Sequence, residues 1–185
     1  DSDRRVVVLF GGVSSTRVFD DLWEWNGVEW TERTVSPKPA ARYGNVLVFD
    51  AALHKVVLFG GTNGAENFGD TWTLDGTGFE DVTTPGPTAG EGRGAAYDPV
   101  GRRIVFAGGG DSNGVVETWE WNGAWSRLPA RGPSSRVWSG LAFDSARGVA
   151  ITHAGTGIVT SQKLLSDTWE LSFRGGTCRS GSDCA

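Results

Sequence analysis

One unit recurs along the chain with a nearly constant period, and this repetition constrains the fold more than any other feature. A Gly-Gly pair follows an apolar run three times, and a degraded copy of the pair stands in the last quarter of the chain: Gly11-Gly12, Gly60-Gly61, Gly108-Gly109 and Ala154-Gly155. A tryptophan closely preceded by an acidic residue recurs in step with these pairs: Trp23, Trp72, Trp119 and Trp169. Two independent markers therefore keep one period of about 50 residues.

Each unit contains four short apolar segments separated by turn residues. In the copy that spans Lys55–Asp98, the run before Gly60-Gly61 is followed by the Trp72 segment, then by Phe79–Val82, and finally by Arg93–Asp98. No window shows the spacing of an amphipathic helix. Four strands in a repeat of this length are typical of a propeller blade. The period therefore predicts an all-β protein built as a propeller.

The sequence resembles a known family at these motifs. The strand Val56–Gly61 and the segment Asp70-Thr71-Trp72 resemble kelch repeats, and they are closest to the bacterial kind related to the central domain of galactose oxidase. The resemblance covers residues 4–173. It implies a kelch-type β-propeller, a scaffold that serves many functions, and so it implies a fold more than an activity.

The repeats predict about four blades. Residues 4–12, 21–26 and 29–33 give three strands of the first blade, and complete blades follow from Arg42 and from Arg93. A fourth blade begins at Arg136 and ends at Phe173 without a fourth strand. Fourteen strands thus make two complete blades and two that lack one strand each. This arrangement predicts a partial ring: a fragment completed by missing blades, or half of a two-chain ring in a homodimer.

Two further expectations concern the repeat core and the chain ends. Period-2 spacing predicts that four tryptophans form the core between blades: Trp23, Trp72, Trp119 and Trp169. Residues 1–174 are expected to form the propeller. The abrupt start at Asp1, close to a strand, predicts a cut piece of a longer protein.

The segment 175–185 is expected to be a cysteine-containing tail or the start of a following Cys-rich module. It resembles the opening of modules that follow propellers in bacterial surface proteins, which implies an extracellular or cell-surface location. Cys178 and Cys184 are close enough in sequence for a disulfide in an oxidising compartment, with two unpaired thiols as the alternative.

Charge and hydropathy exclude two classes of partner. The net charge is −5 and no cluster of Lys and Arg is longer than a pair, so binding to nucleic acid or to an anionic membrane is not expected. No apolar run is long enough to span a membrane.

The residues do not form a recognisable catalytic set. The resemblance raises a galactose oxidase-like copper site, which needs two His, two Tyr and a Cys linked to one Tyr. His54, His153, Tyr43 and Tyr97 meet the count, but they occupy unrelated positions of the repeat. We therefore expect no cofactor and no enzymatic activity in this chain. Asp111-Ser112-Asn113-Gly114 and Asn63–Glu66 suggest calcium loops, although ordinary polar turns explain both.

The most suggestive binding residues are three arginines, each expected at the start of the first strand of a blade: Arg42, Arg93 and Arg136. The resemblance implies a position near the central channel, where they meet acidic groups of a partner. The alternative is that each arginine pairs with an acidic residue of a neighbouring blade. The family pattern commonly has a His three residues after this Arg, and Asn45, Ala96 and Ser139 stand there instead.

Long loops are expected at one end of every blade, and tight turns at the other. The long loops cover residues 13–20, 33–41, 62–69, 83–92, 110–116, 129–135 and 156–166. Because function resides in long loops on a rigid scaffold, ligand contacts are expected there, at Asn67, Phe68, Asp111 and Asn113 and at the three arginines. The expected function is a non-catalytic module that binds a protein or a glycan. The alternatives are the propeller part of a larger secreted enzyme and an architectural spacer.

Overall fold

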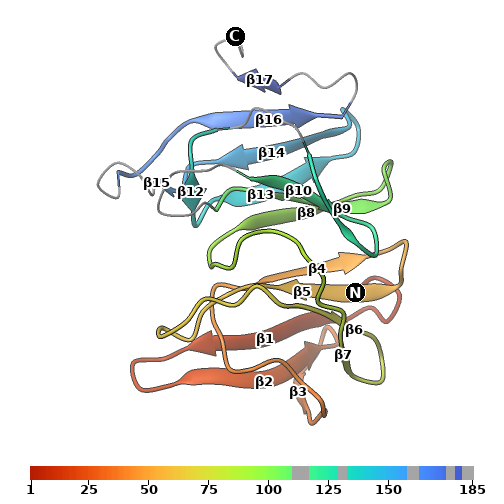
Figure 1. Ribbon diagram of the computed structural model, residues 1–185. Helices are drawn as coiled ribbons and strands as arrows, with labels where there is room; N and C mark the ends of the chain where they lie inside the picture. Colours follow the sequence, from red (N-terminus) through yellow and green to blue (C-terminus); the bar gives the residue numbers. More distant parts are fainter. Residues whose placement is uncertain (110–116, 129–132, 158–162, 174–177, 181–185) are drawn as a thin grey trace. The chain divides into compact units, whose positions relative to one another are not determined.

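The computed structural model describes residues 1–109, 117–128, 133–157, 163–173 and 178–180. Within these ranges the chain forms seventeen β-strands in five antiparallel sheets and no helix (Figure 1). Accordingly, the part of the chain that the structure describes has no helix that is long and apolar enough to cross a membrane. The all-β class predicted from the repeats is confirmed.

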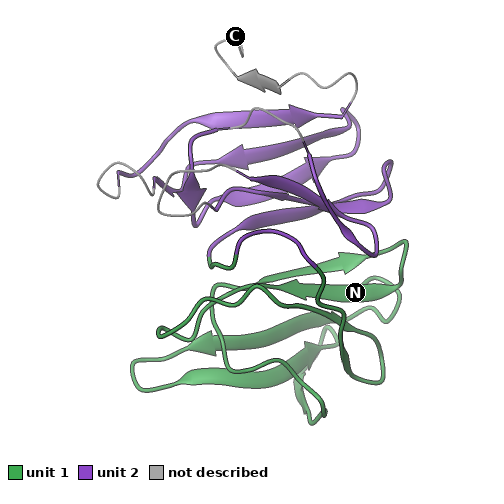
Figure 2. Ribbon diagram, viewed as in Figure 1, with its two compact units in different colours: residues 1–84, 89–91 green, residues 85–88, 92–185 purple. Residues whose placement is uncertain are grey.

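The chain divides into two compact units, which are described one at a time (Figure 2). Unit 1 comprises Asp1–Thr84 and Ala89–Glu91. Unit 2 comprises Pro85–Thr88 and Gly92–Ala185.

Unit 1 contains two sheets in which each strand pairs with its neighbour in sequence. The first has three strands, β1 (Val7–Val13), β2 (Val18–Trp25) and β3 (Trp30–Arg33). The second has four, β4 (Val46–Asp50), β5 (Lys55–Phe59), β6 (Thr71–Leu74) and β7 (Phe79–Asp81). Both are simple meanders, as the turn residues between the apolar segments require.

The core of unit 1 lies between these two sheets. Alternate residues of β1 and β2 meet those of the second sheet in one buried cluster: Phe10, Leu22, Val56, Leu58, Leu74 and Phe79. The ring centroids of Phe10 and Phe79 are 5.2 Å apart. Burial of each such side chain contributes about 1.5–3 kcal/mol, so this cluster is the main source of stability in unit 1.

Unit 2 contains two four-stranded meanders and a small additional ladder. The first meander has β8 (Gly94–Asp98), β9 (Arg103–Ala107), β10 (Thr118–Trp121) and β11 (Trp125–Arg127). The second has β13 (Gly140–Asp144), β14 (Val149–His153), β16 (Thr168–Ser172) and β17 (Cys178–Ser180). The ladder joins β12 (Arg136–Val137) to β15 (Thr156–Gly157).

The predicted strand pattern needs correction in the first sheet and in the last repeat. The expected long loop 13–20 is wrong, because β1 ends at Val13 and β2 begins at Val18. The prediction that no strand follows Phe173 is wrong, because β17 pairs with β16 as a fourth strand. Edge pairing uses backbone groups alone, so this segment needs no apolar alternation. Arg136 does not open the first strand of this repeat: it lies in β12, and the strand that pairs with β14 is β13. Arg42 does not open its strand either, because β4 begins at Val46.

The four marker tryptophans are half-buried, and Trp72 packs against the core cluster of unit 1. The most buried indoles are two others, Trp121 and Trp125, which are 1% and 9% exposed. Their ring centroids lie 5.1 Å apart, and the Trp125 ring lies 4.5 Å from that of Phe106. Sequence spacing alone does not distinguish the two sets, because both lie on alternating positions of a strand.

Candidate functional site

Two long connections of unit 1 lie at one end of its two sheets. Antiparallel order places the long β3–β4 and β5–β6 connections at the same end as the short β1–β2 turn of residues 14–17, and the other tight turns at the opposite end (Figure 1). The backbone amide of Arg42 donates to the Phe19 carbonyl at 3.0 Å, and Lys38 forms an ion pair of 2.8 Å with Asp20. The β3–β4 connection is therefore fixed against the β1–β2 hairpin.

Arg42 stands at the centre of this end of unit 1, and it is completely buried. Its Nη1 and Nη2 atoms donate to the two carboxylate oxygens of Asp70 at 2.6 and 2.8 Å. Nη1 also donates to the Gly60 carbonyl, and the guanidinium lies 4.2 Å from the ring centroid of Phe68. The Trp72 indole Nε1–H donates to the same carboxylate at 2.7 Å. We call this arginine–carboxylate–tryptophan arrangement the clamp.

The charge of Arg42 is balanced by a carboxylate that stays ionised. Burial raises the pKa of Asp70, but the hydrogen bonds from Arg42 and Trp72 outweigh this effect and hold the pKa below its ordinary value. A bidentate, charge-assisted pair of this kind fixes both side chains in one orientation. The clamp therefore ties the β3–β4 connection to the start of β6.

Unit 2 contains the same clamp around Arg136, which is also fully buried. Arg136 donates from Nη1 and Nη2 to the Asp167 carboxylate at 2.7 and 2.8 Å, and from Nη1 to the Ala154 carbonyl. The Trp169 indole donates to Asp167 at 2.6 Å. The hydrogen bond from Arg136 holds the pKa of Asp167 far below its ordinary range.

Arg93 reaches a similar place from a different backbone position. The backbone carbonyls of Arg42 and Arg136 accept from Gly12 and Gly109, whereas the equivalent amide of Gly61 donates to Gly90. Gly90 is therefore the positional equivalent of Arg42 and Arg136. Arg93, three residues later, donates from Nη1 to the Gly108 carbonyl at 3.1 Å, as Arg42 does to Gly60.

The carboxylate of this third clamp is Glu117, and it is turned away. Its Oε2 atom lies 3.9 Å from Nη1 of Arg93 and accepts instead from the amide and hydroxyl of Thr88 at 3.0 and 2.8 Å. Within the described residues the buried Nε1–H of Trp119 has no acceptor. Burial lowers the pKa of Arg93, and Glu117 offsets this only in part.

These contacts correct one expectation about the arginines. Arg42 and Arg136 do pair with acidic residues, but Asp70 and Asp167 precede strands of the same sheet and do not belong to a neighbouring one. Direct ligand contact by these arginines requires displacement of the carboxylate, because the side chains are at most 1% exposed. Their contact with a ligand stays a prediction.

The other predicted binding residues of unit 1 lie in the loop 62–69. Asn67 is exposed and its backbone bridges to Thr62, whereas Phe68 is half-buried beneath Arg42. The Asn63 side chain accepts from the amides of Ala65 and Glu66 at 2.9 Å, as in an ordinary polar turn. Asp111 and Asn113 lie outside the described residues.

The residues considered for metal binding have separate partners. The His54 ring bonds to Asp3 and the His153 ring to Thr168. In the described parts of the chain, no group of three His, Cys, Asp or Glu residues is arranged to hold a metal ion. The backbone of Cys178 lies in β17, and Cys184 is outside the described residues, so their pairing stays untested.

Trp138 in unit 2 is a residue that the sequence reading missed. It follows Arg136 by two positions, as Gly44 follows Arg42 and Gly92 follows Gly90. Both glycines have a positive φ of 65°, and Trp138 adopts the same left-handed conformation with a φ of 59°. Its side chain is 55% exposed. Alignment of the second and fourth repeats on Arg42 and Arg136 shows this glycine-to-tryptophan exchange.

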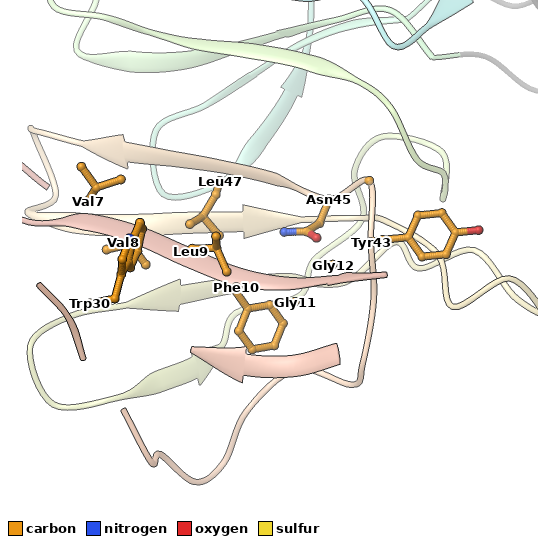
Figure 3. Close-up of a pocket in the computed structure, with 11 residues that line it drawn as sticks. Val7, Val8, Leu9, Phe10, Gly11, Gly12, Trp30, Tyr43, Asn45 and Leu47 are labelled. Atoms are coloured by element: carbon orange, nitrogen blue, oxygen red, sulfur yellow. The ribbon is translucent and has the colours of Figure 1, made fainter. Parts of the chain in front are cut away.

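An open groove of about 410 Å³ runs along β1 in unit 1 (Figure 3). Val7, Leu9 and Trp30 line it from the first sheet. The β3–β4 connection and β4 line it from the second sheet through Tyr43, Asn45 and Leu47. The groove is therefore mainly apolar, with a phenol and an amide at one end.

Comparison with known proteins gives no assignment, because no protein-family model and no curated protein matches the chain.

Proposed function

We propose that the chain is a non-catalytic, kelch-type β-propeller module that binds a protein or a glycan through the long loops at one end of its sheets. The observation that carries this proposal is Trp138, an exposed indole on a strained backbone. The repeat motifs and the meander sheets support the kelch-type fold, and the proposed extracellular location rests on the resemblance of the segment 175–185 to Cys-rich modules of bacterial surface proteins.

The conformation of Trp138 is unfavourable for the chain itself. A left-handed backbone costs about 1–2 kcal/mol for a residue with a Cβ atom, and equivalent positions of two other repeats carry glycine. Because Trp138 is more than half exposed, burial of its side chain offsets little of this free-energy cost. The Trp138 amide donates to the Gly92 carbonyl at 2.6 Å, a bond that a glycine at this position would also make. Strain of this kind is typical of functional positions.

The chemistry of Trp138 favours a protein partner. Tryptophan, tyrosine and arginine dominate the energetics of protein interfaces, since they combine a large apolar area with a polar group. The exposed indole also offers a flat face for a sugar ring, so a glycan is the second candidate. A spacer or a part of a larger enzyme needs no exposed, strained tryptophan at this position.

The test compares the unmodified chain with Trp138→Gly on a carbohydrate array and against binders selected from a phage-displayed peptide library. Glycine suits the left-handed conformation, so the free energy of unfolding is expected to change by no more than about 1 kcal/mol. Saturable binding is expected to weaken at least tenfold. The matched control is Trp30→Ala, which removes an exposed indole of unit 1 outside the loops.

Equal binding by Trp138→Gly and the unmodified chain would remove Trp138 from the site. No saturable binding to either probe would favour the spacer reading.

A further inference from the structure

Two turns of the molecule carry the same three residues, Asn-Gly-Ala, in different surroundings. Asn63–Ala65 lies in the β5–β6 connection of unit 1, and Asn122–Ala124 forms the β10–β11 turn of unit 2. A third Asn-Gly pair begins at Asn26, in the β2–β3 turn of unit 1. The glycines of these three pairs have positive φ angles of 90°, 102° and 98°, which glycine adopts without strain.

An asparagine that precedes a glycine can lose its side-chain amide group without an enzyme. The backbone nitrogen of the glycine forms a bond to Cγ of the asparagine, and the bond between Cγ and Nδ2 breaks. The proton of the glycine amide leaves with Nδ2 as ammonia. Water then opens the resulting five-membered imide at either carbonyl, which gives aspartate or isoaspartate. Glycine favours the first step because it has no Cβ atom to shield its nitrogen.

The Asn63 side chain is restrained by three hydrogen bonds. Its Oδ1 atom accepts from the backbone amides of Ala65 and Glu66 at 2.9 Å, and its Nδ2 atom donates to the Glu66 carboxylate at 3.3 Å. Oδ1 of Asn26 likewise accepts from the amides two and three positions later, at 2.8 and 3.0 Å. Because attack on Cγ rotates the side-chain amide group, these bonds must break before the ring can close.

The Asn122 side chain has no such restraint, since it makes no hydrogen bond within the described residues. The backbone bond of its turn, from the Asn122 amide to the Ala124 carbonyl, is 3.4 Å long, and all three residues of the turn are exposed. Apart from its chain neighbours, no described residue has an atom within 4 Å of the place that a Cβ of Gly123 would take. The amide group of Asn122 can therefore rotate toward the Gly123 nitrogen without losing a contact.

The position of this turn gives the reaction a consequence for the core of unit 2. Trp121 and Trp125 flank the turn, pair with one another across β10 and β11, and are 1% and 9% exposed. Isoaspartate adds one methylene group to the backbone of the short turn that joins them. Because turn geometry sets the register of a hairpin, this addition disturbs the pairing of the two buried tryptophans.

We propose that Asn122 is a site of spontaneous deamidation, at which the Gly123 nitrogen displaces ammonia and water completes the conversion to aspartate or isoaspartate. The hydrogen bonds of Asn63 and Asn26 make these two residues slower. The site lies outside the loops of the proposed binding function and is independent of that function.

The experiment incubates the full chain at mildly alkaline pH and follows the loss of each side-chain amide by peptide mapping with mass spectrometry. In the folded chain, Asn122 is expected to react at least about fivefold faster than Asn63, because Asn63 must first give up its hydrogen bonds. In concentrated urea, the two residues are expected to react at nearly the same rate, since both are followed by Gly-Ala.

The matched variant is Asn122→Gln, whose longer side chain would have to close a six-membered ring and therefore reacts much more slowly. This variant is expected to abolish the conversion in its own peptide and to leave the rate at Asn63 unchanged. Equal rates at Asn122 and Asn63 in the folded chain would overturn the proposal, as would an Asn122 that reacts in urea but not in the folded chain. A difference of the same size that persists in urea would also overturn it, because the flanking sequence and not the turn would then set the rate.

Discussion

The clamps of the β4–β7 sheet and of the β8–β11 sheet differ by one methylene group in the carboxylate. Asp70 is short enough to hold Arg42 with both oxygens and to accept from Trp72. Glu117 reaches past this position to Thr88 and leaves Trp119 without an acceptor within the described residues. The arginine also enters differently, from a position three residues later than its counterpart. The repeat thus preserves the place of the guanidinium group more closely than its contacts.

The comparison also distinguishes residues that stabilise the fold from residues that are available to contact a ligand. The guanidinium groups of Arg42 and Arg136 hold strands together through bidentate ion pairs, and both residues are buried. Exposed loop residues that do not stabilise the sheets are then better candidates for ligand contact. Trp138 is the residue that fits this description best.

The largest effect is expected from Asp70→Ala. Loss of one partner of a buried ion pair leaves Arg42 as an uncompensated buried charge, which costs about 3–5 kcal/mol. Chemical denaturation of the full chain measures this loss. The control is Glu80→Gln, which removes the exposed ion pair of Lys55 and should cost less than about 1 kcal/mol. Similar losses in both variants would mean that the clamp is no stronger than a surface ion pair.

A smaller effect is expected from Glu117→Asp, which gives the third clamp the carboxylate of the other two. The shorter side chain can accept from Trp119 but gives up the two bonds from Thr88. Because these terms oppose one another, the free energy of unfolding should change by no more than about 1 kcal/mol. A loss as large as that of Asp70→Ala would show that Thr88, and not Trp119, is the essential partner of Glu117.

The smallest effect concerns acid stability. The folded-state pKa of Asp70 is lower than its ordinary value of 3.8, so its contribution is complete above that value and is lost as the pH falls through the lower, folded-state pKa. The same sign applies to Asp167. Stability curves between pH 2 and 6 should therefore fall less steeply on the acid side in Asp70→Asn than in the unmodified chain. An unchanged slope would contradict an ionised carboxylate in the clamp.

The repeat period predicted the strands well, because turn residues and alternating apolar residues are local signals. The period correctly located β4 to β7 and β8 to β11, whose bounds lie within the expected segments. It missed β17, because an edge strand is held by backbone pairing and has no side-chain signature. It also missed Trp138, because a positive φ follows from the path of the chain and not from the residue itself.

Sequence analysis left two roles open for the arginines. Pairing with an acidic residue is found for Arg42 and Arg136, within one sheet, and ligand contact stays a prediction. A buried bidentate pair and an exposed ligand contact use the same side chain, and only burial tells them apart. The spacing of Arg93 indicated that it is not at the position equivalent to Arg42. Arg93 stands five residues before Asp98, whereas Arg42 stands eight residues before Asp50.

The clamp as a repeated element is tested most directly by the indole region of a proton–nitrogen NMR spectrum with assigned tryptophans. A hydrogen bond to a carboxylate moves the indole proton downfield, so the signals of Trp23, Trp72 and Trp169 are expected to lie together downfield of Trp119. In Glu117→Asp the Trp119 signal should move toward that group. A downfield Trp119 signal in the unmodified chain, or signals of Trp72 and Trp169 at the position of a free indole, would contradict the account.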